Sequence, residues 1–432
     1  MDKFDRQVRI WGTHGQHIIE TSHVCVVGSS PFAFEIVKNL ALPGIGCLTM
    51  IATNSRDLEQ NQFWNMKTWN VTQIDWNAEK MGSDVFWSDF ELIIITTGQN
   101  DVLKVFRQIK SPPVLLCSTS GQNGFVTFLS GEPHFVVESH PEHTIPDLRL
   151  GALRSDLSQF YSEFLKNTVC ISDLPFAALL YHACENVLKE KKPHQVINRH
   201  DLKDQINVLQ NKVSPNTQLP NFFEALRFAH LALERTETLP ENVIRCLALK
   251  DVSCQIPFNQ NVQTLLRALS SFLDTPYSEG QLPLAGIIPD MESSYEMYTA
   301  LRNAYSGAAE NDVKIFHNLV SSEVSHIEID QVKSFCRNCR HINVIEPIGK
   351  LGDFESVLND ETTDSTIIKN VLHSCLSEAL KKEDKRRFYP CISFVAGIAA
   401  QEAIKVLTHQ FLPLHNTLVY EGELGRLRSI KI

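Results

Sequence analysis

The chain has 432 residues, of which 43% are hydrophobic and 21% charged, the composition of an ordinary globular protein long enough for two or three domains. Its formal net charge of -10 argues against nucleic acid as the main partner, because nucleic-acid-binding surfaces are rich in lysine and arginine. No apolar run reaches the roughly 18 residues that span a bilayer and the first residues contain no signal-peptide core, so we expect no membrane partner and a cytoplasmic or nuclear location.

The first part of the chain has the pattern of a parallel α/β sheet, because short apolar strands alternate with helical or loop stretches from residue 23 to about 130. A helix is expected at 31–42. The stretch 65–89 is short for a helix, a strand and their loops, so the sequence leaves open whether the sheet is complete there. The expected strands are 23–28, 47–52, 92–97, 114–117 and 125–129.

The loop after the first strand lacks features of a phosphate-binding loop. Such a loop places glycines near positions 28, 30 and 33, so that bare backbone N–H groups approach the phosphates. Only Gly28 is present, and Ser30 and Ala33 replace the other two. Pro31 has no N–H to donate and Phe32 adds bulk near the phosphate path, although proline is well placed to open a helix. We expect the helix to form and the phosphate site to be lost.

The contact to a ribose is missing as well. The second strand ends at Thr53 and Asn54, where an acidic residue normally accepts the ribose hydroxyls. Because the glycines and the acid are lost together, the sequence predicts a nucleotide-binding fold that binds no nucleotide. We expect no cofactor on this chain.

The middle and the end of the chain have different patterns. Helical periodicity dominates between about 150 and 385, and a helix rich in small residues at 393–407 is followed by a strand at 417–420. This return to strand and helix predicts that the last segment packs on the first domain. The expected fold is therefore α/β, a Rossmann-like doubly wound sheet with a largely α-helical inserted domain. The predicted domains are 1–150, 151–385 and 386–432.

Eleven cysteines are scattered, mostly inside apolar runs, which is typical of buried, reduced thiols. The exception is the pair Cys336 and Cys339, whose spacing fits half of a zinc site or a redox pair. A structural zinc normally takes four ligands. The other candidates, His341, Cys375 and Cys391, form no second close pair, so we expect no metal.

Four segments resemble a known family. Residues 4–12, Phe-Asp-Arg-Gln-Val-Arg-Ile-Trp-Gly, resemble the opening of the adenylation domains of ubiquitin-activating enzymes and their relatives. Three further segments are similar to the regulatory subunit of the activating enzyme for the Rub or Nedd-type ubiquitin-like modifier. The resemblance covers nearly the whole chain in order. The three segments are 138–143 with 147–150, 286–291 and 400–405.

The resemblance implies half of an enzyme. In that family two related adenylation-type halves form a heterodimer, and only one half binds ATP and magnesium and carries the catalytic cysteine. This chain is similar to the other half, a non-catalytic regulatory subunit. Its sheet domain is then a degenerate adenylation domain, and 151–385 is a catalytic-cysteine-like domain that lacks the cysteine. The active half's Asn-Arg-Gln run appears only as Gln60-Asn61-Gln62. The implied partners are the catalytic subunit and the ubiquitin-like protein.

Arg6 is the one site residue that the resemblance implies, because the matching arginine of the family reaches across the dimer into the partner's ATP site. Adenylation builds charge on phosphoryl oxygens and on departing pyrophosphate, and a guanidinium neutralises that charge with a bidentate geometry that lysine lacks. The alternative for Arg6 is a salt bridge to Asp5 or another local acid. Arg9 is expected to be an ion-pair or surface residue, and Trp11 a core anchor.

Two other functions stay open at this stage. One is the equivalent subunit of the SUMO-activating enzyme, which is expected to be more compact than a chain with a helical insertion at 151–385. The other is a self-sufficient enzyme, either a dinucleotide-dependent oxidoreductase or an adenylating enzyme. The altered loop and the missing ribose acid disfavour that second alternative.

Overall fold

The computed structural model describes most of the chain, and its residues form two compact units that are treated separately below. The described residues are 3–53, 70–110, 112–141, 146–168, 170–190, 197–233, 238–323, 327–347 and 388–430. The first unit consists of Met1–Ser139, Cys254–Asn259 and Asn343–Ile432, and the second of His140–Ser253 and Gln260–Ile342. Residues 348–387, of which 348–385 belong to the expected helical range 151–385, lie outside the described residues.

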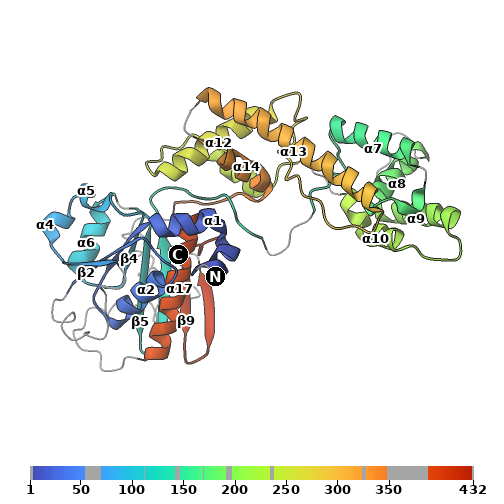
Figure 1. Cartoon of the computed structure of the whole chain (residues 1–432). Helices are drawn as coiled ribbons and strands as arrows, with labels where there is room; N and C mark the ends of the chain where they lie inside the picture. The colour runs from blue at the N-terminus through green and yellow to red at the C-terminus, as the bar shows by residue number, and fades with distance from the viewer. Residues whose placement is uncertain are drawn as a thin grey trace, which may run out of the picture. The chain divides into compact units, whose positions relative to one another are not determined.

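An eight-stranded sheet is the frame of the first unit (Figure 1), with the strand order β10-β9-β6-β5-β4-β1-β2-β3. The five strands from β5 to β3 in this order run parallel, and β6, β9 and β10 add antiparallel pairs. The reversal of order beside β1 is the doubly wound arrangement, which confirms the predicted Rossmann-like α/β fold. The strands are β1 (His23–Val27), β2 (Cys47–Ala52), β3 (Val71–Asp75), β4 (Leu92–Ile95), β5 (Val114–Ser120), β6 (Asn123–Leu129), β9 (Thr417–Glu421) and β10 (Arg426–Ile430).

The stretch that looked too short for a complete sheet does contain a strand. β3 lies at one edge of the sheet and pairs in parallel with β2. Between β3 and β4 stand two four-residue helices, α4 (Ala78–Met81) and α5 (Asp84–Trp87), in the place of one longer crossover helix. The shortened connection accounts for the small number of residues available there.

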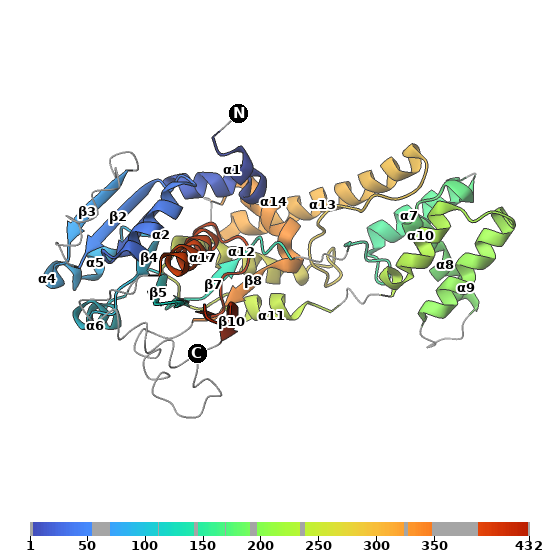
Figure 2. The ribbon, with the colours of Figure 1, turned by 90° about the horizontal axis from the view of Figure 1, so that it is seen from below.

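Helices cover both faces of the sheet (Figure 2). Helices α1 (Asp5–Thr21), α2 (Pro31–Ala41) and α17 (Tyr389–Thr408) pack on one face, and α4, α5 and α6 (Asn100–Gln108) on the other. Because successive strand residues point to opposite faces, Val24 and Val26 join the first core while Cys25 and Val27 join the second. Strands β1 and β4 are therefore buried on both faces, as their continuous apolar runs indicate.

Helix α17 is long and apolar enough to cross a membrane by length and composition, and it is the one such helix among the described residues. In this structure 67% of its most apolar stretch is buried inside the protein. Its small residues Ala396, Ala399 and Ala403 lie in the core against α2 and the sheet. The helix thus has the environment of a core helix.

The second unit is largely α-helical, as predicted. Its 29-residue helix α13 (Tyr295–Glu323) runs along the unit (Figure 1). One part of α13 packs with α7 to α10 through residues such as Tyr305, and another part packs with α12 and α14 through Phe316. The other helices are α7 (Ser155–Asn167), α8 (Phe176–Glu190), α9 (Arg199–Val213), α10 (Pro220–Phe228), α11 (Glu241–Ala248), α12 (Pro257–Leu273) and α14 (Ile329–Asn338).

Candidate functional site

The glycine that remains in the β1–α2 loop is needed for packing. Gly28 has a φ of +138°, and a Cβ on it would lie 2.1 Å from Thr96 Oγ1. Thr96 directly follows the neighbouring strand β4 and donates a hydrogen bond from its hydroxyl to Val27 O over 3.1 Å. A glycine is therefore required where two parallel strands end side by side, whether or not a phosphate binds.

The start of α2 uses its own side chain as a cap. Ser30 Oγ accepts a hydrogen bond from Ala33 N over 3.3 Å. This N–H is one of those that would otherwise donate to a bound phosphate. Pro31 opens the helix and contributes no N–H. Phe32 is only 4% exposed and lies in the core beneath the helix, so our expectation that its bulk stands in the phosphate path was wrong. The Ser30 cap and Pro31 thus leave the start of α2 with fewer free N–H donors.

The ribose side of the loop is described only in part. Thr53 directly follows β2 and has no carboxylate. Asn54 and the run Gln60–Gln62 lie outside the described residues. The absence of a ribose-binding acid after Thr53 therefore stays a prediction from the sequence.

Arg6 lies in the first turn of α1, and its side chain is exposed. The acid that sequence reasoning paired with it is engaged elsewhere, because Asp5 Oδ2 binds Arg9 Nη2 at 2.9 Å. This exposed pair confirms Arg9 as an ion-pair residue and contributes about 0.5 kcal/mol or less. Within the described part of the chain, Arg6 makes no hydrogen bond or ion pair. Its guanidinium is available to a group outside this chain.

Two aromatic residues anchor the segment that carries Arg6. The Phe4 ring lies on the backbone of Gly44, where a Cβ would be 2.6 Å from Phe4 Cζ. Trp11 is 6% exposed, and its ring meets Phe411 edge-on with centroids 5.3 Å apart. Gln410 Nε2 also donates to Trp11 O over 3.0 Å. Trp11 is thus a core anchor, as predicted from the sequence.

Helix α1 is broken immediately after this anchor. Gly12 has φ 71° and ψ 171° inside what is otherwise a continuous run of helical residues. The residues on either side form two helical arms, one with Arg6 and one with Gln16. Neither this helix nor its break was predicted from the sequence, and a lone glycine inside a helical pattern gives no clear signal of a break.

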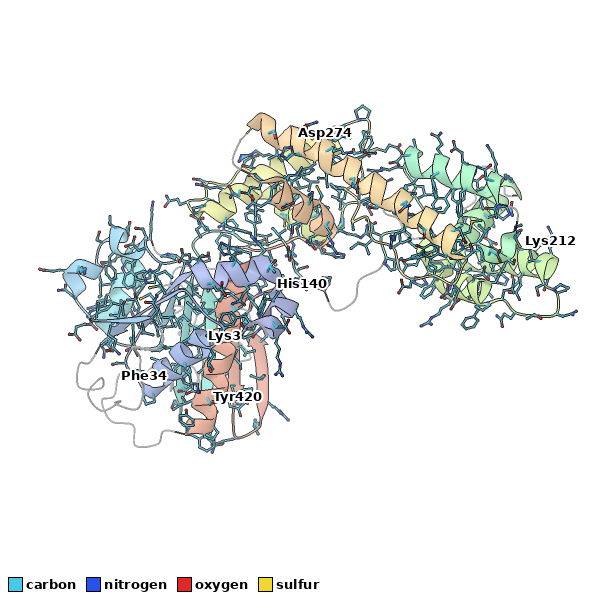
Figure 3. All side chains as sticks on the ribbon, in the orientation of Figure 1. Lys3, Phe34, His140, Lys212, Asp274 and Tyr420 are labelled. Carbon is cyan, nitrogen blue, oxygen red and sulfur yellow. The ribbon has the colours of Figure 1, made fainter. Side chains whose placement is uncertain are left out.

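An uncovered apolar surface lies beside α17 on the sheet. Phe394 of α17 is 44% exposed, and its ring centroid is 4.7 Å from that of Tyr420, which Figure 3 labels on β9. Tyr420 pairs directly with Leu427 of β10, which is 49% exposed. Opposite residues of an antiparallel pair point to the same face. We refer to Phe394, Tyr420 and Leu427 as the β9–β10 surface.

A buried carboxylate joins α2 to the beginning of α17. Glu35 is 2% exposed and accepts hydrogen bonds from Tyr389 Oη over 2.8 Å and from Ser393 Oγ over 3.3 Å. Lys38 binds the same carboxylate. Burial raises the pKa of Glu35, but the hydrogen bonds and the charge of Lys38 outweigh it and hold the pKa below its usual value. This contact fixes α17 against α2 and with it the position of Phe394.

Two of the sequence segments that carry the family resemblance make packing contacts in the second unit. The Arg149 guanidinium binds Asp147 at 2.9 Å and donates to the carbonyl oxygens of Leu282 and Pro283. Gly286, with φ +73°, lets the chain pass Ala309, whose Cβ would be 2.7 Å from a Cβ at residue 286. These motif residues have structural roles.

The Cys336 and Cys339 pair is buried in the second unit. Burial raises the pKa of both thiols well above the ordinary value, whereas zinc binding and redox exchange need thiolates. Cys391 lies in α17 of the first unit, and Cys375 is outside the described residues. Across the described ranges no three metal-ligating side chains come together.

Comparison with known proteins agrees with the resemblance in the motifs. No family model matches the chain. The "NEDD8-activating enzyme E1 regulatory subunit" of Saccharomyces cerevisiae is 28% identical, with 100% of both chains covered. The protein of the same name from Xenopus laevis is 26% identical over 98% of this chain and 97% of its own, and "NEDD8-activating enzyme E1 regulatory subunit AXR1" of Arabidopsis thaliana is 24% identical over 100% and 96%. The chain is a homologue of these regulatory subunits.

These similarities extend over nearly the whole chain, in agreement with the resemblance in the four short segments. They include α1 with Arg6, both units and the final helix and strands. The relatives are named as regulatory subunits, in agreement with the altered loop between β1 and α2.

Proposed function

We propose that this chain is the regulatory subunit of a heterodimeric activating enzyme for a NEDD8-type ubiquitin-like protein. It supports a catalytic subunit and completes that subunit's ATP site with Arg6. The observation that carries the proposal is a contrast within one unit. The chain's own nucleotide loop is closed by capping and proline, while Arg6 is exposed on an anchored helix and has no ion-pair partner among the described residues.

The division of labour follows from the loop. With Ala33 N bound to Ser30 Oγ and no N–H on Pro31, the helix N-terminus offers phosphates fewer donors than a working adenylation site does. ATP and magnesium therefore bind the partner, and this chain binds no cofactor. Adenylation and thioester formation take place on the catalytic subunit.

Arg6 acts in trans. The reaction joins the modifier's C-terminal carboxylate to the α-phosphate of ATP and releases pyrophosphate, so negative charge grows on oxygens that a guanidinium can bind with two parallel N–H groups. Asp5 is paired with Arg9, so it forms no ion pair with Arg6. The anchors Phe4 and Trp11 fix the segment from which Arg6 extends.

The β9–β10 surface is the part of the sheet unit that we assign to the catalytic subunit. Phe394 and Leu427 of this surface are exposed and Tyr420 is half-buried beside them, whereas α1, α2 and α17 cover other parts of that face. Obligate interfaces bury roughly 2,000 Å² or more and are more apolar than ordinary surface. The modifier and the catalytic subunit are the partners that this function requires, and neither a nucleic acid nor a membrane takes part.

The two other functions have less support. No observation in the described structure favours the SUMO-type subunit, and the relatives reported above are all named for NEDD8. A self-sufficient enzyme would need the phosphate donors that the loop lacks. The ten cysteines in the described ranges form no disulfide, which supports a cytoplasmic or nuclear location.

Two measurements on the protein test this assignment. Affinity purification from the source cell should recover a second adenylation-type chain in equal amount. Calorimetry with ATP and magnesium should give no binding to this chain alone and binding to the purified pair. Micromolar ATP binding to the isolated chain, or a monomer that ignores the second chain in size-exclusion chromatography, would contradict the proposal.

A further inference from the structure

Gly12 breaks α1 with a backbone conformation that belongs to glycine. Its φ of 71° and ψ of 171° lie in a region that residues with side chains almost never enter. A Cβ at residue 12 would meet no atom within 4 Å, so crowding is not what requires the glycine. The requirement comes from the direction of the backbone.

The break lets both arms of α1 contact one short turn of the chain. The Phe4 ring lies against Gly44, and Gln16 Nε2 donates to Pro43 O over 3.1 Å. In a straight helix, residues as far apart as Phe4 and Gln16 would be separated by about 18 Å along the axis, whereas adjacent Cα atoms such as those of Pro43 and Gly44 are about 3.8 Å apart. The two contacts place both arms of α1 on the same turn, and Gly12 is where the helical backbone between them is interrupted.

The arm between Phe4 and Gly12 is the one that carries Arg6. Phe4 holds its first end on Gly44, and Trp11 holds its last end in the core. The position of Arg6 relative to the sheet is therefore set by two anchors and by the turn at Gly12. A side chain at residue 12 disfavours this backbone conformation, and a change in φ and ψ there would displace the segment between the two anchors.

We propose that Gly12 is a positioning residue for adenylation, whose backbone conformation places Arg6 where the partner's ATP site needs it. The inference rests on the proposed function of Arg6. Gly12 itself touches no reactant. Its substitution acts through the location of the guanidinium, because a displacement of about 1 Å in a charge-stabilising group can slow a reaction by about 10²-fold.

The test compares reconstituted heterodimers that differ at one or two residues. Gly12→Ala, Arg6→Ala and the double variant are measured beside Gly280→Ala. Gly280 is a matched control, because it has φ +74°, has no atom within 4 Å of an added Cβ and lies in the second unit. Pyrophosphate exchange gives kcat and the KM for ATP, and size-exclusion chromatography reports assembly.

We expect Gly12→Ala to assemble and to lower kcat about tenfold to a hundredfold. The split between kcat and KM should match that of Arg6→Ala, and Gly280→Ala should exchange at the wild-type rate. The double variant should be no slower than Arg6→Ala, because residues that act through one group are not additive. A double variant slowed by the product of the two single effects would overturn the inference.

The outcomes separate this inference from the proposed function. A wild-type rate in Arg6→Ala would contradict the role of Arg6 in adenylation, and the positioning role of Gly12 would be overturned with it. A slow Arg6→Ala with a wild-type Gly12→Ala would overturn the role of Gly12 alone. Failure of Gly12→Ala to assemble, when Gly280→Ala assembles, would also overturn it, because Gly12 would then serve the dimer rather than the place of Arg6.

Discussion

The Phe4 ring rests on the backbone of Gly44, so closely that a Cβ at residue 44 would lie 2.6 Å from Phe4 Cζ. Gly44 also has a φ of +91°, which disfavours a side chain. The contact ties the start of α1 to the turn between α2 and β2. It links a glycine far from the nucleotide loop to the presentation of Arg6.

The first prediction concerns this contact. Gly44→Ala should lower the free energy of unfolding by about 1 to 3 kcal/mol from backbone strain and should also displace the Phe4 ring. Urea denaturation of the chain measures the stability, and pyrophosphate exchange of the heterodimer measures the displacement. Gly131→Ala is the control, because nothing lies within 4 Å of its added Cβ and its φ is not positive. Equal behaviour of the two variants would contradict the role of the contact.

The second prediction concerns the cap of α2. Ser30→Ala should lower the free energy of unfolding by about 1 kcal/mol, since Ala33 N loses its acceptor. The double variant Ser30→Gly with Ala33→Gly should restore the glycine pattern and still bind no ATP, because Pro31 donates no N–H. Denaturation and calorimetry check the two parts. Micromolar ATP binding by the double variant would show that the glycines alone had been missing.

The third prediction concerns pH. His409 is half-buried, donates a hydrogen bond from Nδ1 to Phe135 O over 2.8 Å, and stacks on Phe258 with centroids 3.5 Å apart. Burial lowers its pKa to about 4, whereas an unfolded histidine titrates near about 6.5. Between these values the unfolded state binds more protons, so lowering the pH should remove roughly 3 kcal/mol of stability through His409.

His409→Asn should flatten this dependence. Asparagine tolerates the left-handed backbone of residue 409, whose φ is 52°, although the lost stacking lowers stability at neutral pH. The readout is the slope of unfolding free energy against pH from 6.5 to 4, obtained by urea denaturation at each pH. An unchanged slope would show that His409 does not remain neutral in the folded protein.

The fourth prediction concerns the β9–β10 surface. Leu427→Asp should weaken the heterodimer at least about tenfold, because an apolar contact of the interface becomes a buried charge. Val85→Asp is the matched control, since Val85 is 77% exposed in the same unit but lies on α5 at the other face of the sheet. Sedimentation or titration calorimetry gives the affinities. Equal affinities for the two variants would place the interface elsewhere.

The sequence was sufficient for the parts of the fold that depend on local patterns. The apolar runs predicted β1, β2 and β4, and Pro31 marked the first turn of α2. Strand β3 was not recognised, because an edge strand with Thr72 and Gln73 has little apolar signal. Such a strand is fixed by pairing with β2, which no local pattern reports.

The site divides in the same way. The loss of donors in the loop was readable from Pro31, and Arg6 came from the family resemblance. The break at Gly12 was not readable, because its need arises from contacts at Pro43 and Gly44 that are distant in sequence. The β9–β10 surface was not readable either, since it depends on the register of Tyr420 with Leu427.

The most direct test of the central claim is pyrophosphate exchange by the heterodimer that carries Arg6→Ala. Lys104→Ala is the control, because Lys104 is an exposed cation of the same unit that lies on α6 at the other face of the sheet. We predict that both variants assemble, that Lys104→Ala exchanges at the wild-type rate and that Arg6→Ala is slower by up to about 10³-fold. Arg6→Lys should recover only part of the rate, since lysine lacks the two parallel donors. A wild-type rate in Arg6→Ala at limiting ATP would contradict the account.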